Sequence, residues 1–564
     1  MPSEHDLFVL TNAQLIRGDG LSDDGASAVA VRHGRIAAVG GSELTGVFPG
    51  ARVVDLGGRS LLPGINDSHT HLGIFGSARP PLALDLTFPN VGSIEQVAEL
   101  VRARVSDPPA DGWIRGFGWD LGYLTECRDG RRMPTRLDLD TVAPHTPVVL
   151  QDFSCHMIWA NTEALRRAGV TATTPVPEGG VILRDHDGEP TGILQEGAQH
   201  LVQTHMPAFT REAKRTALRT SLDLLHANGV TSVTDAALGP GGAGLFGGAI
   251  DAETLELLAE LVGADGVRMR TNVLLLFAPL GSVSLAAVQD GLTTYTPPPE
   301  KRDWFRIAGV KLFADGIPPN QTAWMHQCYS SGGHGALTIA GGDVDEQITH
   351  LQRLVQTVHD AGYQLGVHVT GDRAIEAVTQ AFIAAQHANP RPDPRHYLIH
   401  GDFTSPEVMD QCRRYGIGIN MQPAIQWTIA ELTEQLLGRD HAEREWPMSS
   451  ALRAGVVVAS SSDCPITYPN WLQGAAAAVL RESKANGSVY GPDERVTVEQ
   501  AVQTYTRNGA WQDHAETWKG TISPGQVADL CVVDARLLDD DPHDWAAAKV
   551  SATVVGGETV YGEL

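Results

Sequence analysis

Residues 61–72, LLPGINDSHTHL, decide the fold, because an apolar strand ends there in a polar segment that carries two histidines. His69 and His71 lie two positions apart, so on a strand both side chains point to one face and can hold a single metal ion. Such a pair at the end of an apolar strand is typical of the active-site face of a barrel of parallel strands. Because the spacing also occurs for packing alone, the interpretation depends on the segments that follow.

Seven further apolar segments follow, and helical patterns separate most of them. Apolar residues recur at helical spacing in residues 345–362, DEQITHLQRLVQTVHDAG, and residues 212–229 show the same pattern. Alternating strands and helices predict parallel βα units, and eight such strands close a (β/α)8 TIM-type barrel in an α/β protein. The eight predicted strands lie within residues 61–72, 229–237, 267–277, 305–316, 363–372, 396–403, 416–424 and 456–465.

The two ends of the chain and one long internal stretch depart from this pattern. Residues 1–62 and 515–564 consist of short strand-like segments separated by glycine, so we predict one β-sandwich built from both chain ends, with two unrelated β-rich ends as the alternative. Residues 79–211 carry strands of their own after the first barrel strand, which predicts an inserted subdomain that covers the barrel mouth as a lid. The barrel is then assigned residues 63–78 and 212–514.

The composition limits the partners of the chain. The formal net charge is -25 and no basic patch offsets it, so nucleic acid and anionic membrane surfaces would be repelled. We find neither a basic, apolar signal segment nor the run of about 20 apolar residues that spans a bilayer, and the six cysteines lie far apart. We therefore expect a cytoplasmic enzyme with a small-molecule substrate and no nucleic-acid or membrane partner. Self-association as a homodimer is compatible with such a barrel.

Side chains that bind metals also end four later strands. Each follows an apolar run, and the set is Lys311, His368, His400 and Asp463. Taken singly, each has a structural explanation, such as a core histidine, a helix-capping aspartate or a lysine whose stem packs. Their arrival from different strands at one barrel rim predicts a divalent-metal site, with zinc as the first choice and manganese, iron or nickel as alternatives.

The order of the motifs resembles the amidohydrolase superfamily, specifically its YtcJ-like branch, the amidohydrolase 3 family. The resemblance runs nearly end to end and rests on LLPGINDSHTHL, GFGWD, QDFSCHMIWANTEAL, GILQEGA, VKLFADG, GVHVTGDRAIE, LIHGDF, SSSDCP and GTISPGQVADLCVVD. It implies a (β/α)8 barrel with a β-sandwich from both chain ends. One segment departs from the family pattern, because Ile317-Pro318-Pro319-Asn320 stands where a Ser- and Gly-rich stretch is expected, so no relative's substrate carries over directly.

The resemblance also implies a role for each ligand-type residue. The first strand supplies a metal pair, the fifth and sixth strands one histidine each, and the eighth an aspartate. The matching residues are His69, His71, His368, His400 and Asp463.

Lys311 matches a position at which related enzymes carry an N6-carboxylysine that bridges two metals. The alternative is a plain Lys311 that packs its stem or pairs with Asp315, which would leave one metal per chain. In the implied mechanism, metal-activated water attacks, Asp463 moves a proton to the leaving nitrogen, and His368 or His400 stabilises the oxyanion. We expect cleavage of an amide C–N bond in an N-acyl, N-formyl or carbamate group. A deaminase or cyclic-amide hydrolase acting on a heterocycle and an inactive binding module remain as alternatives.

Four further residues are candidates for substrate contact. Three resemble family pocket positions in the predicted lid, and the fourth lies in a predicted loop at the barrel mouth; they are Trp119, Asp120, His156 and Trp324. A buried tryptophan or a residue that stabilises a turn would produce the same pattern, so a purely structural role stays open for each.

Overall fold

The computed structural model describes residues 7–20, 25–88, 90–128, 132–153, 157–177, 180–278 and 283–564. These residues form two compact units. The first comprises Met1–His71, Leu222–Gly242 and Leu258–Leu564, and the second comprises Leu72–Ser221 and Ala243–Leu257.

The first unit contains a sheet of eight parallel strands, and all eight predicted barrel strands are confirmed. Its two outer strands meet, because the Ser68 hydroxyl donates to the Ser460 carbonyl at 2.8 Å and the Asp463 N–H donates to the His69 carbonyl at 3.0 Å. The sheet therefore closes on itself as a TIM-type barrel. In spatial order the strands are β7 (Ile65–Thr70), β14 (Val230–Leu238), β15 (Arg270–Leu275), β16 (Phe305–Phe313), β17 (Gln364–Val369), β18 (Tyr397–His400), β19 (Gly418–Met421) and β20 (Val458–Ser460).

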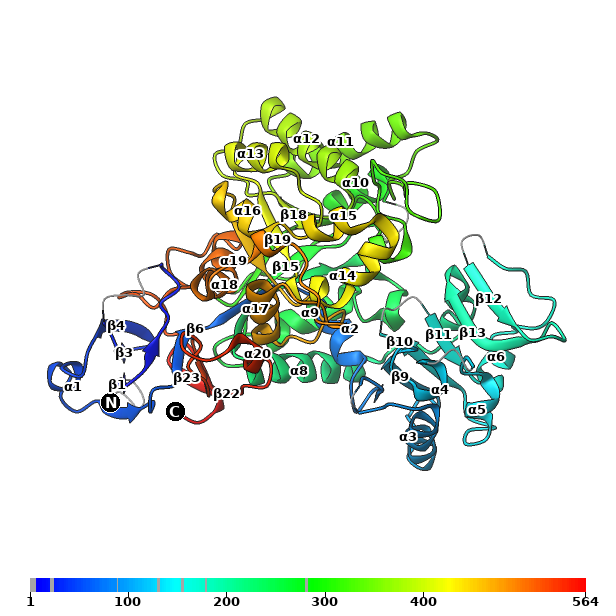
Figure 1. Ribbon diagram of the computed structural model, residues 1–564, viewed down its shortest axis with the longest axis horizontal. Helices are drawn as coiled ribbons and strands as arrows, with labels where there is room; N and C mark the ends of the chain where they lie inside the picture. The colour runs from blue at the N-terminus through cyan, green and yellow to red at the C-terminus, as the bar shows by residue number, and fades with distance from the viewer. Residues whose placement is uncertain are drawn as a thin grey trace. The chain divides into compact units, whose positions relative to one another are not determined.

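Amphipathic helices connect these strands and pack on the outside of the barrel, as α11, α12 and α13 do in Figure 1. In α11 the buried residues Leu351, Leu354, Val355 and Val358 recur at helical spacing, and Asp343 caps the helix by accepting the Glu346 N–H. The helices of this region are α8 (Arg211–Ala227), α9 (Ala252–Leu261), α10 (Leu285–Thr294), α11 (Val344–Asp360), α12 (Asp372–Ala388), α13 (Pro406–Tyr415), α14 (Pro423–Leu437), α15 (Arg439–Arg444), α16 (Met448–Arg453), α17 (Trp471–Leu480), α18 (Val498–Thr504) and α19 (Arg507–Gln512).

Both chain ends contribute to a β-sandwich in the first unit, as predicted. Strand β6 pairs antiparallel with β21, so that Leu61 lies opposite Val532. A common apolar core joins Phe8 and Leu10 to Leu530 and Val554. The four-stranded sheet is β4 (Arg35–Gly40), β3 (Ala28–Arg32), β1 (Leu7–Thr11) and β5 (Arg52–Asp55), and the five-stranded sheet is β2 (Gln14–Leu15), β6 (Ser60–Pro63), β21 (Leu530–Val533), β22 (Val550–Val555) and β23 (Glu558–Gly562).

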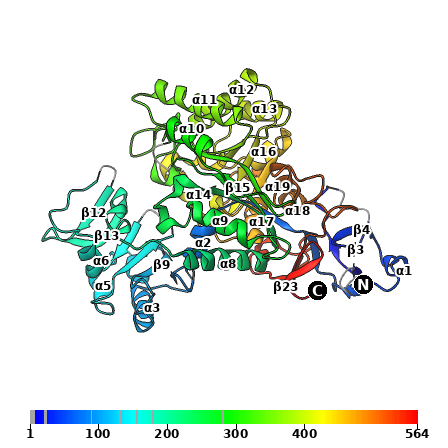
Figure 2. The ribbon, with the colours of Figure 1, turned by 180° about the vertical axis from the view of Figure 1, so that it is seen from behind.

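The second unit is the predicted insertion and has a six-stranded sheet with its own core. Val97 and Val101 of α3 (Ile94–Ser106) pack with Ile114 and Trp119, and Figure 2 shows α3, α5 (Arg136–Asp140) and α6 (Thr162–Arg167) beside this sheet. The strands are β12 (Gly180–Arg184), β13 (Pro190–Glu196), β11 (Met157–Ala160), β10 (Val148–Asp152), β9 (Ile114–Trp119) and β8 (Leu84–Asp85).

The compact second unit extends beyond residues 79–211 because helix α2 (Leu72–Ser77) packs against it very closely. A Cβ atom on Gly73 would lie 1.8 Å from the Ala249 carbonyl oxygen, and one on Gly76 would lie 1.8 Å from that of Ala217. Only glycine permits this approach of helix and backbone. In the described part of the chain, no helix combines the length and the apolar character required to cross a membrane.

Candidate active site

The barrel strands bring all six predicted metal ligands to their carboxyl ends. His69 lies near the end of β7 and His71 directly follows that strand, while Asp463 follows β20. Lys311, His368 and His400 lie on the consecutive strands β16, β17 and β18. Because the carboxyl ends of parallel barrel strands converge on one face, residues far apart in the sequence become neighbours.

Asp463 lies at the centre of this group. Its Oδ1 atom is 3.3 Å from His69 Nε2 and 3.3 Å from His71 Nε2. The ligand atoms of His69, His400 and Asp463 all lie within 4.8 Å of one another. His368 adjoins the group, since its ring centroid lies 4.6 Å from that of His400.

The donor set fits a divalent cation. Asp463 Oδ1 is buried and has no hydrogen-bond partner among the described residues, although two imidazole nitrogens face it. A buried carboxylate oxygen without a partner is costly, so a missing positive charge is the simplest explanation. Ligand atoms around a tetrahedral zinc ion lie about 3.3 Å apart when each bond is about 2.0 Å long, and the observed spacing agrees with this value.

The backbone at two of these residues is strained. His400 has a φ of 75° and Asp463 a φ of 54°, in the left-handed region that residues other than glycine rarely adopt. Such conformations persist only where the surrounding structure holds them, and they concentrate at functional sites. The surrounding tertiary structure, rather than local backbone preference, therefore sets the orientation of both side chains.

Hydrogen bonds fix which nitrogen of two histidines carries the proton. His400 Nδ1 lies 2.8 Å from Gln422 Oε1, and His368 Nε2 lies 3.1 Å from the Gly316 carbonyl. Since both acceptors are oxygens, these nitrogens carry the hydrogen in a neutral ring, and the opposite nitrogens keep their lone pairs. Both imidazoles thus suit a metal ligand. Neither has a spare N–H for an oxyanion, so the geometry does not support the predicted role of His368 or His400 as an oxyanion donor.

The electrostatics keep His69, His368 and His400 neutral and Asp463 ionised. Burial lowers the pKa of His69 to about 3 and that of His368 to about 4, and the charge of Lys311 acts in the same direction. Burial also holds the pKa of His400 well below its ordinary value. Burial alone would raise the pKa of Asp463, but the neighbouring histidines, His69 foremost, outweigh it and hold that pKa well below its ordinary value. These are the protonation states in which imidazole and carboxylate bind metals.

Lys311 is buried beside this group and is only 2% exposed. Burial lowers the pKa of its amine to about 7, although the carboxylates of Asp463 and Asp235 act to raise it. Its Nζ lies 4.9 Å from the centre of the Phe313 ring, and it makes no hydrogen bond to a described residue. Lys311 therefore faces the acidic residues of the site rather than solvent.

The predicted alternative of a Lys311–Asp315 pair is wrong. Asp315 is buried and accepts three backbone N–H groups, from Trp324 and Gly371 at 2.9 Å and from Thr370 at 3.0 Å. These bonds tie the segment after β16 to the segment after β17. The Asp315 side chain thus binds backbone groups of neighbouring loops, whereas the Lys311 side chain lies beside the candidate metal ligands. Their nearness in sequence did not reveal this difference.

The candidate substrate residues have mostly structural surroundings. Trp119 is fully buried in the core of the second unit, where its Nε1 donates to the Leu150 carbonyl at 2.9 Å, which favours packing over substrate contact. Asp120 accepts the Gly122 N–H at 2.7 Å in a turn. Trp324 is also buried, and the Arg373 guanidinium stacks on its ring at 4.2 Å. His156 lies outside the described residues.

Two carboxylates and one amide at the same end of the barrel were missed in the sequence. Asp67 accepts hydrogen bonds from the Ser462 N–H at 2.9 Å and hydroxyl at 2.6 Å, which joins β7 to the segment after β20. Asp235 near the end of β14 acts electrostatically on Lys311. It lies in the last part of a barrel strand, as several predicted ligands do, so the same rule could have found it. Gln422 gives no such signal, because amides are common at strand ends.

Known proteins share this architecture over nearly the whole chain. The sequence profile of the Amidohydrolase family matches residues 52–561. The chain is 29% identical over 518 residues to the putative amidohydrolase YtcJ of Bacillus subtilis strain 168, covering 91% of each protein. It is also 29% identical over 547 residues to N-substituted formamide deformylase of Arthrobacter pascens, covering 95% of each.

Solved structures agree on the fold. The crystal structure of an uncharacterized metal-dependent hydrolase from Pyrococcus horikoshii superimposes with a TM-score of 0.70 at 20% sequence identity, over 95% of this chain and 99% of that chain. The corresponding protein of Pyrococcus furiosus gives 0.69 at 22% identity, over 95% of this chain and 99% of that chain. Because the family profile spans almost all of the sequence, this protein belongs to the Amidohydrolase family and is a hydrolase.

Proposed function

We propose that this hydrolase cleaves the C–N bond of a small organic amide, in an N-acyl, N-formyl or carbamate group, at a divalent-metal centre. The observation that carries the proposal is the buried Asp463 Oδ1, which has no hydrogen-bond partner in the described part of the chain and faces two imidazole nitrogens at 3.3 Å. The related N-substituted formamide deformylase acts, by its name, on N-substituted formamides, which supports an amide carbonyl as the reacting group.

The residues that would hold the metal centre are His69, His71, His368, His400 and Asp463. When bound, a divalent cation supplies Lewis acidity, which polarises a carbonyl and lowers the pKa of a coordinated water from about 15.7 toward about 7. Zinc suits the nitrogen-rich donor set best.

The protein's own contribution is to position the reactants and to move one proton. Asp463 is buried and ionised, so it can accept a proton from the attacking water as the new C–O bond forms. The same carboxyl group then gives this proton to the leaving nitrogen as the C–N bond breaks. The products are an amine and a carboxylic acid, or a carbonic acid half-ester where the substrate is a carbamate; the acid releases its proton to solvent, and Asp463 ends the cycle in its starting state.

Lys311 would hold a second cation as N6-carboxylysine. Its support is positional, because the side chain is buried at the same barrel end, where the charges of Asp463 and Asp235 both act on it. Carboxylation converts a cation into an anion, which a pair of metal ions would stabilise. A plain Lys311 would correspond to one metal per chain.

Metal content and activity test the proposal together. We would count metal atoms per chain by plasma mass spectrometry before and after chelation, and assay a panel of N-substituted formamides and anilides. Two metals with chelator-sensitive turnover would support the bridged site, and one metal a mononuclear site. Metal-free protein with chelator-insensitive turnover would overturn the proposal, and release of ammonia would point to a deaminase.

Two matched histidine variants distinguish metal bound at the barrel site from metal bound at the protein surface. His69→Ala should lose metal, whereas His186→Ala should retain it. His186 belongs to the other His and Asp group whose ligand atoms lie within 4.8 Å among the described residues, but its side chain is 89% exposed. Equal metal loss in both variants would count against the assigned site.

A further inference from the structure

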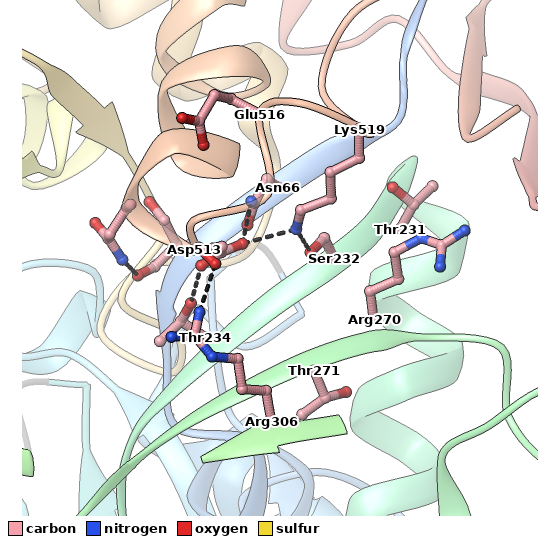
Figure 3. Close-up of polar contacts among 12 residues, drawn as sticks. Asn66, Thr231, Ser232, Thr234, Arg270, Thr271, Arg306, Asp513, Glu516 and Lys519 are labelled. Carbon is pink, nitrogen blue, oxygen red and sulfur yellow. Dashed lines mark hydrogen bonds and ion pairs between the residues drawn. The ribbon is translucent and has the colours of Figure 1, made fainter. Parts of the chain in front are cut away.

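A polar cavity lies at the opposite end of the barrel, where strands β15 and β16 begin. Its volume is about 260 Å³, and it is lined by residues of these two strands, of the segment 301–304 before β16 and of the segment 513–519. Figure 3 shows Arg270, Arg306, Asp513 and Lys519 of this lining. The amino ends of barrel strands ordinarily serve stability, so a polar cavity there needs its own explanation.

Asp513 forms the floor of this cavity and is fully paired. Its carboxylate accepts hydrogen bonds from Asn66 Nδ2 at 2.7 Å, Thr234 Oγ1 at 3.1 Å and Lys519 Nζ at 2.7 Å. Lys519 also donates to the Ser232 hydroxyl, and Figure 3 shows these side chains converging on Asp513. The floor therefore has no capacity left for a cation.

The unused hydrogen-bonding groups of the cavity lie on two neighbouring strands. Asn272 and Arg306 are register partners in β15 and β16, so their side chains leave the sheet on the same face. Asn272 is only 6% exposed, yet its amide makes no hydrogen bond to a described residue. Arg306 uses one guanidinium nitrogen, which donates to the Asp513 carbonyl at 2.6 Å, and the rest of its planar fork has no described partner.

Two tryptophans supply apolar surface beside these groups. Trp304 and Trp518 line the cavity and stack on the Arg270 guanidinium, which lies 4.7 Å and 5.1 Å from their ring centres. Arg270 is itself paired with both carboxylate oxygens of Asp529, so this stack is held in place. A ligand that contacts the rings would meet a rigid apolar wall.

The charge of the cavity favours an anion. Four cations line it, namely Arg270, Lys301, Arg306 and Lys519, while Asp303 and Asp513 line it as well and Asp529 lies directly behind. Four positive and three negative groups leave one positive charge, in a chain whose formal net charge is -25. Among the described residues, neither Arg306 nor Lys301 pairs with a carboxylate: Arg306 donates to the Asp513 carbonyl at 2.6 Å, and Lys301 Nζ donates to the Val262 carbonyl at 2.8 Å.

We propose that this basal cavity binds a small organic carboxylate with an attached planar apolar group. The Arg306 fork matches a carboxylate with two parallel hydrogen bonds, and the Asn272 amide can bond to one of the same oxygens. The tryptophan rings accommodate the apolar part. This assignment is independent of the proposed reaction, because the ligand binds at the opposite ends of the strands.

Benzoate is the probe, and its binding to the metal-loaded full chain is measured by calorimetry and by tryptophan fluorescence. We expect one saturable site per chain. The neutral analogue benzamide should bind at least about tenfold more weakly than benzoate, since a charge-assisted hydrogen bond is lost. Arg306→Gln should weaken benzoate binding about tenfold or more. The matched control is Arg302→Gln, because the Arg302 side chain is 91% exposed and does not line the cavity.

Two further variants keep the test decisive. Asn272→Ala should also weaken benzoate binding, and it provides the test if Arg306→Gln does not fold. His69→Ala should leave benzoate binding unchanged, and this result would exclude binding at the metal end of the barrel. The proposal is overturned if no saturable binding occurs up to about 10 mM benzoate, if Arg306→Gln and Asn272→Ala bind as tightly as the parent, or if inorganic phosphate binds more tightly than benzoate.

Discussion

The two ends of the barrel each bury an aspartate, but they differ in what the surrounding atoms lack. At the carboxyl ends, Asp463 Oδ1 has no hydrogen-bond partner among the described residues and faces two imidazole nitrogens at 3.3 Å. At the amino ends, Asp513 accepts hydrogen bonds from Asn66, Thr234 and Lys519. One end therefore has unused acceptors, and the other has unused donors.

The hydrogen-bond partners of the two carboxylates distinguish a ligand-binding aspartate from a structural aspartate more clearly than their burial does. Asp463 and Asp513 are equally buried, at 5% exposure each. Unused acceptors with neutral histidines call for a cation, whereas the unused donors of Asn272 and Arg306 call for an anion. The predictions below test whether the pairing of each carboxylate determines its role.

Asp463→Asn should have the largest effect on activity. The amide keeps the size of the side chain but cannot accept the proton from water or provide an anionic ligand, so kcat should fall about 10²–10⁴-fold. Metal content should fall with it. The circular dichroism spectrum should stay unchanged, because Oδ1 makes no hydrogen bond to a described residue. Turnover within about tenfold of the parent enzyme would remove Asp463 from the proton-transfer role.

Asp513→Asn should show the reverse pattern, with metal content retained and stability reduced. The variant leaves the buried ammonium of Lys519 without its counter-charge, and breaking one side of a buried ion pair typically costs about 3–5 kcal/mol. Urea unfolding of the metal-loaded protein measures the loss. A variant as stable as the parent, or one that loses metal while still folded, would contradict the structural role.

Gln422→Ala should weaken metal binding without abolishing it. Gln422 accepts from His400 Nδ1 at 2.8 Å, and its own amide donates to Asn420 Oδ1 at 2.8 Å and to the Ser461 hydroxyl at 2.9 Å. This network orients the ring, and losing such an outer partner typically lowers metal affinity about 10–100-fold. Competition with a chelator measures the affinity.

The control for Gln422→Ala is Gln380→Ala, because Gln380 bonds only to Gln411 on the exposed surface. The two variants should differ by about tenfold or more in metal affinity if Gln422 positions His400. Equal affinities would mean that His400 is held by the strained backbone of β18 alone.

The fold and the ligand positions could be predicted because they depend on regular patterns. Apolar segments alternate with amphipathic helices, and parallel strands bring their carboxyl ends together, so His69, His368 and Asp463 were placed on one rim from sequence alone. The pairing of the two chain ends followed from their common strand pattern and is confirmed by the β6–β21 ladder.

The remaining features depend on side-chain directions that strand spacing does not encode. The sequence allowed Asp315 to pair with Lys311, but the carboxylate turns toward the backbone of Thr370 and Gly371. Trp119 follows a motif that suggests a pocket, yet its ring fills the core of the second unit. The sequence also did not reveal that Gln422 Oε1 lies 2.8 Å from His400 Nδ1. Each outcome depends on a partner distant in sequence.

Glu445 tests whether a buried carboxylate oxygen without a hydrogen-bond partner always marks a metal ligand. Its substitution should have the smallest effect of the variants described. Its Oε2 is buried without a described partner, as Asp463 Oδ1 is, but no described histidine lies within ion-pair distance of it, and its Oε1 accepts from the Thr433 hydroxyl at 3.0 Å. Burial raises the pKa of Glu445 to about 8 from an ordinary 4.5. The folded protein therefore holds this proton at neutral pH, so no cation is required.

Glu445→Gln should consequently leave metal content unchanged and alter only the pH dependence of stability. A carboxyl group with a raised folded-state pKa contributes most below its unfolded pKa, and that contribution is lost as pH rises from about 4.5 to about 8. Glutamine has no proton to lose, so the variant should gain on the parent over this window, by about 1–3 kcal/mol in urea unfolding at pH 8 relative to pH 5. A constant difference across that range would show that Glu445 is ionised in the folded protein. The ionised Glu445 oxygen would then need a cation, as Asp463 does. In that case the presence or absence of nearby histidines would not distinguish Asp463 from Glu445.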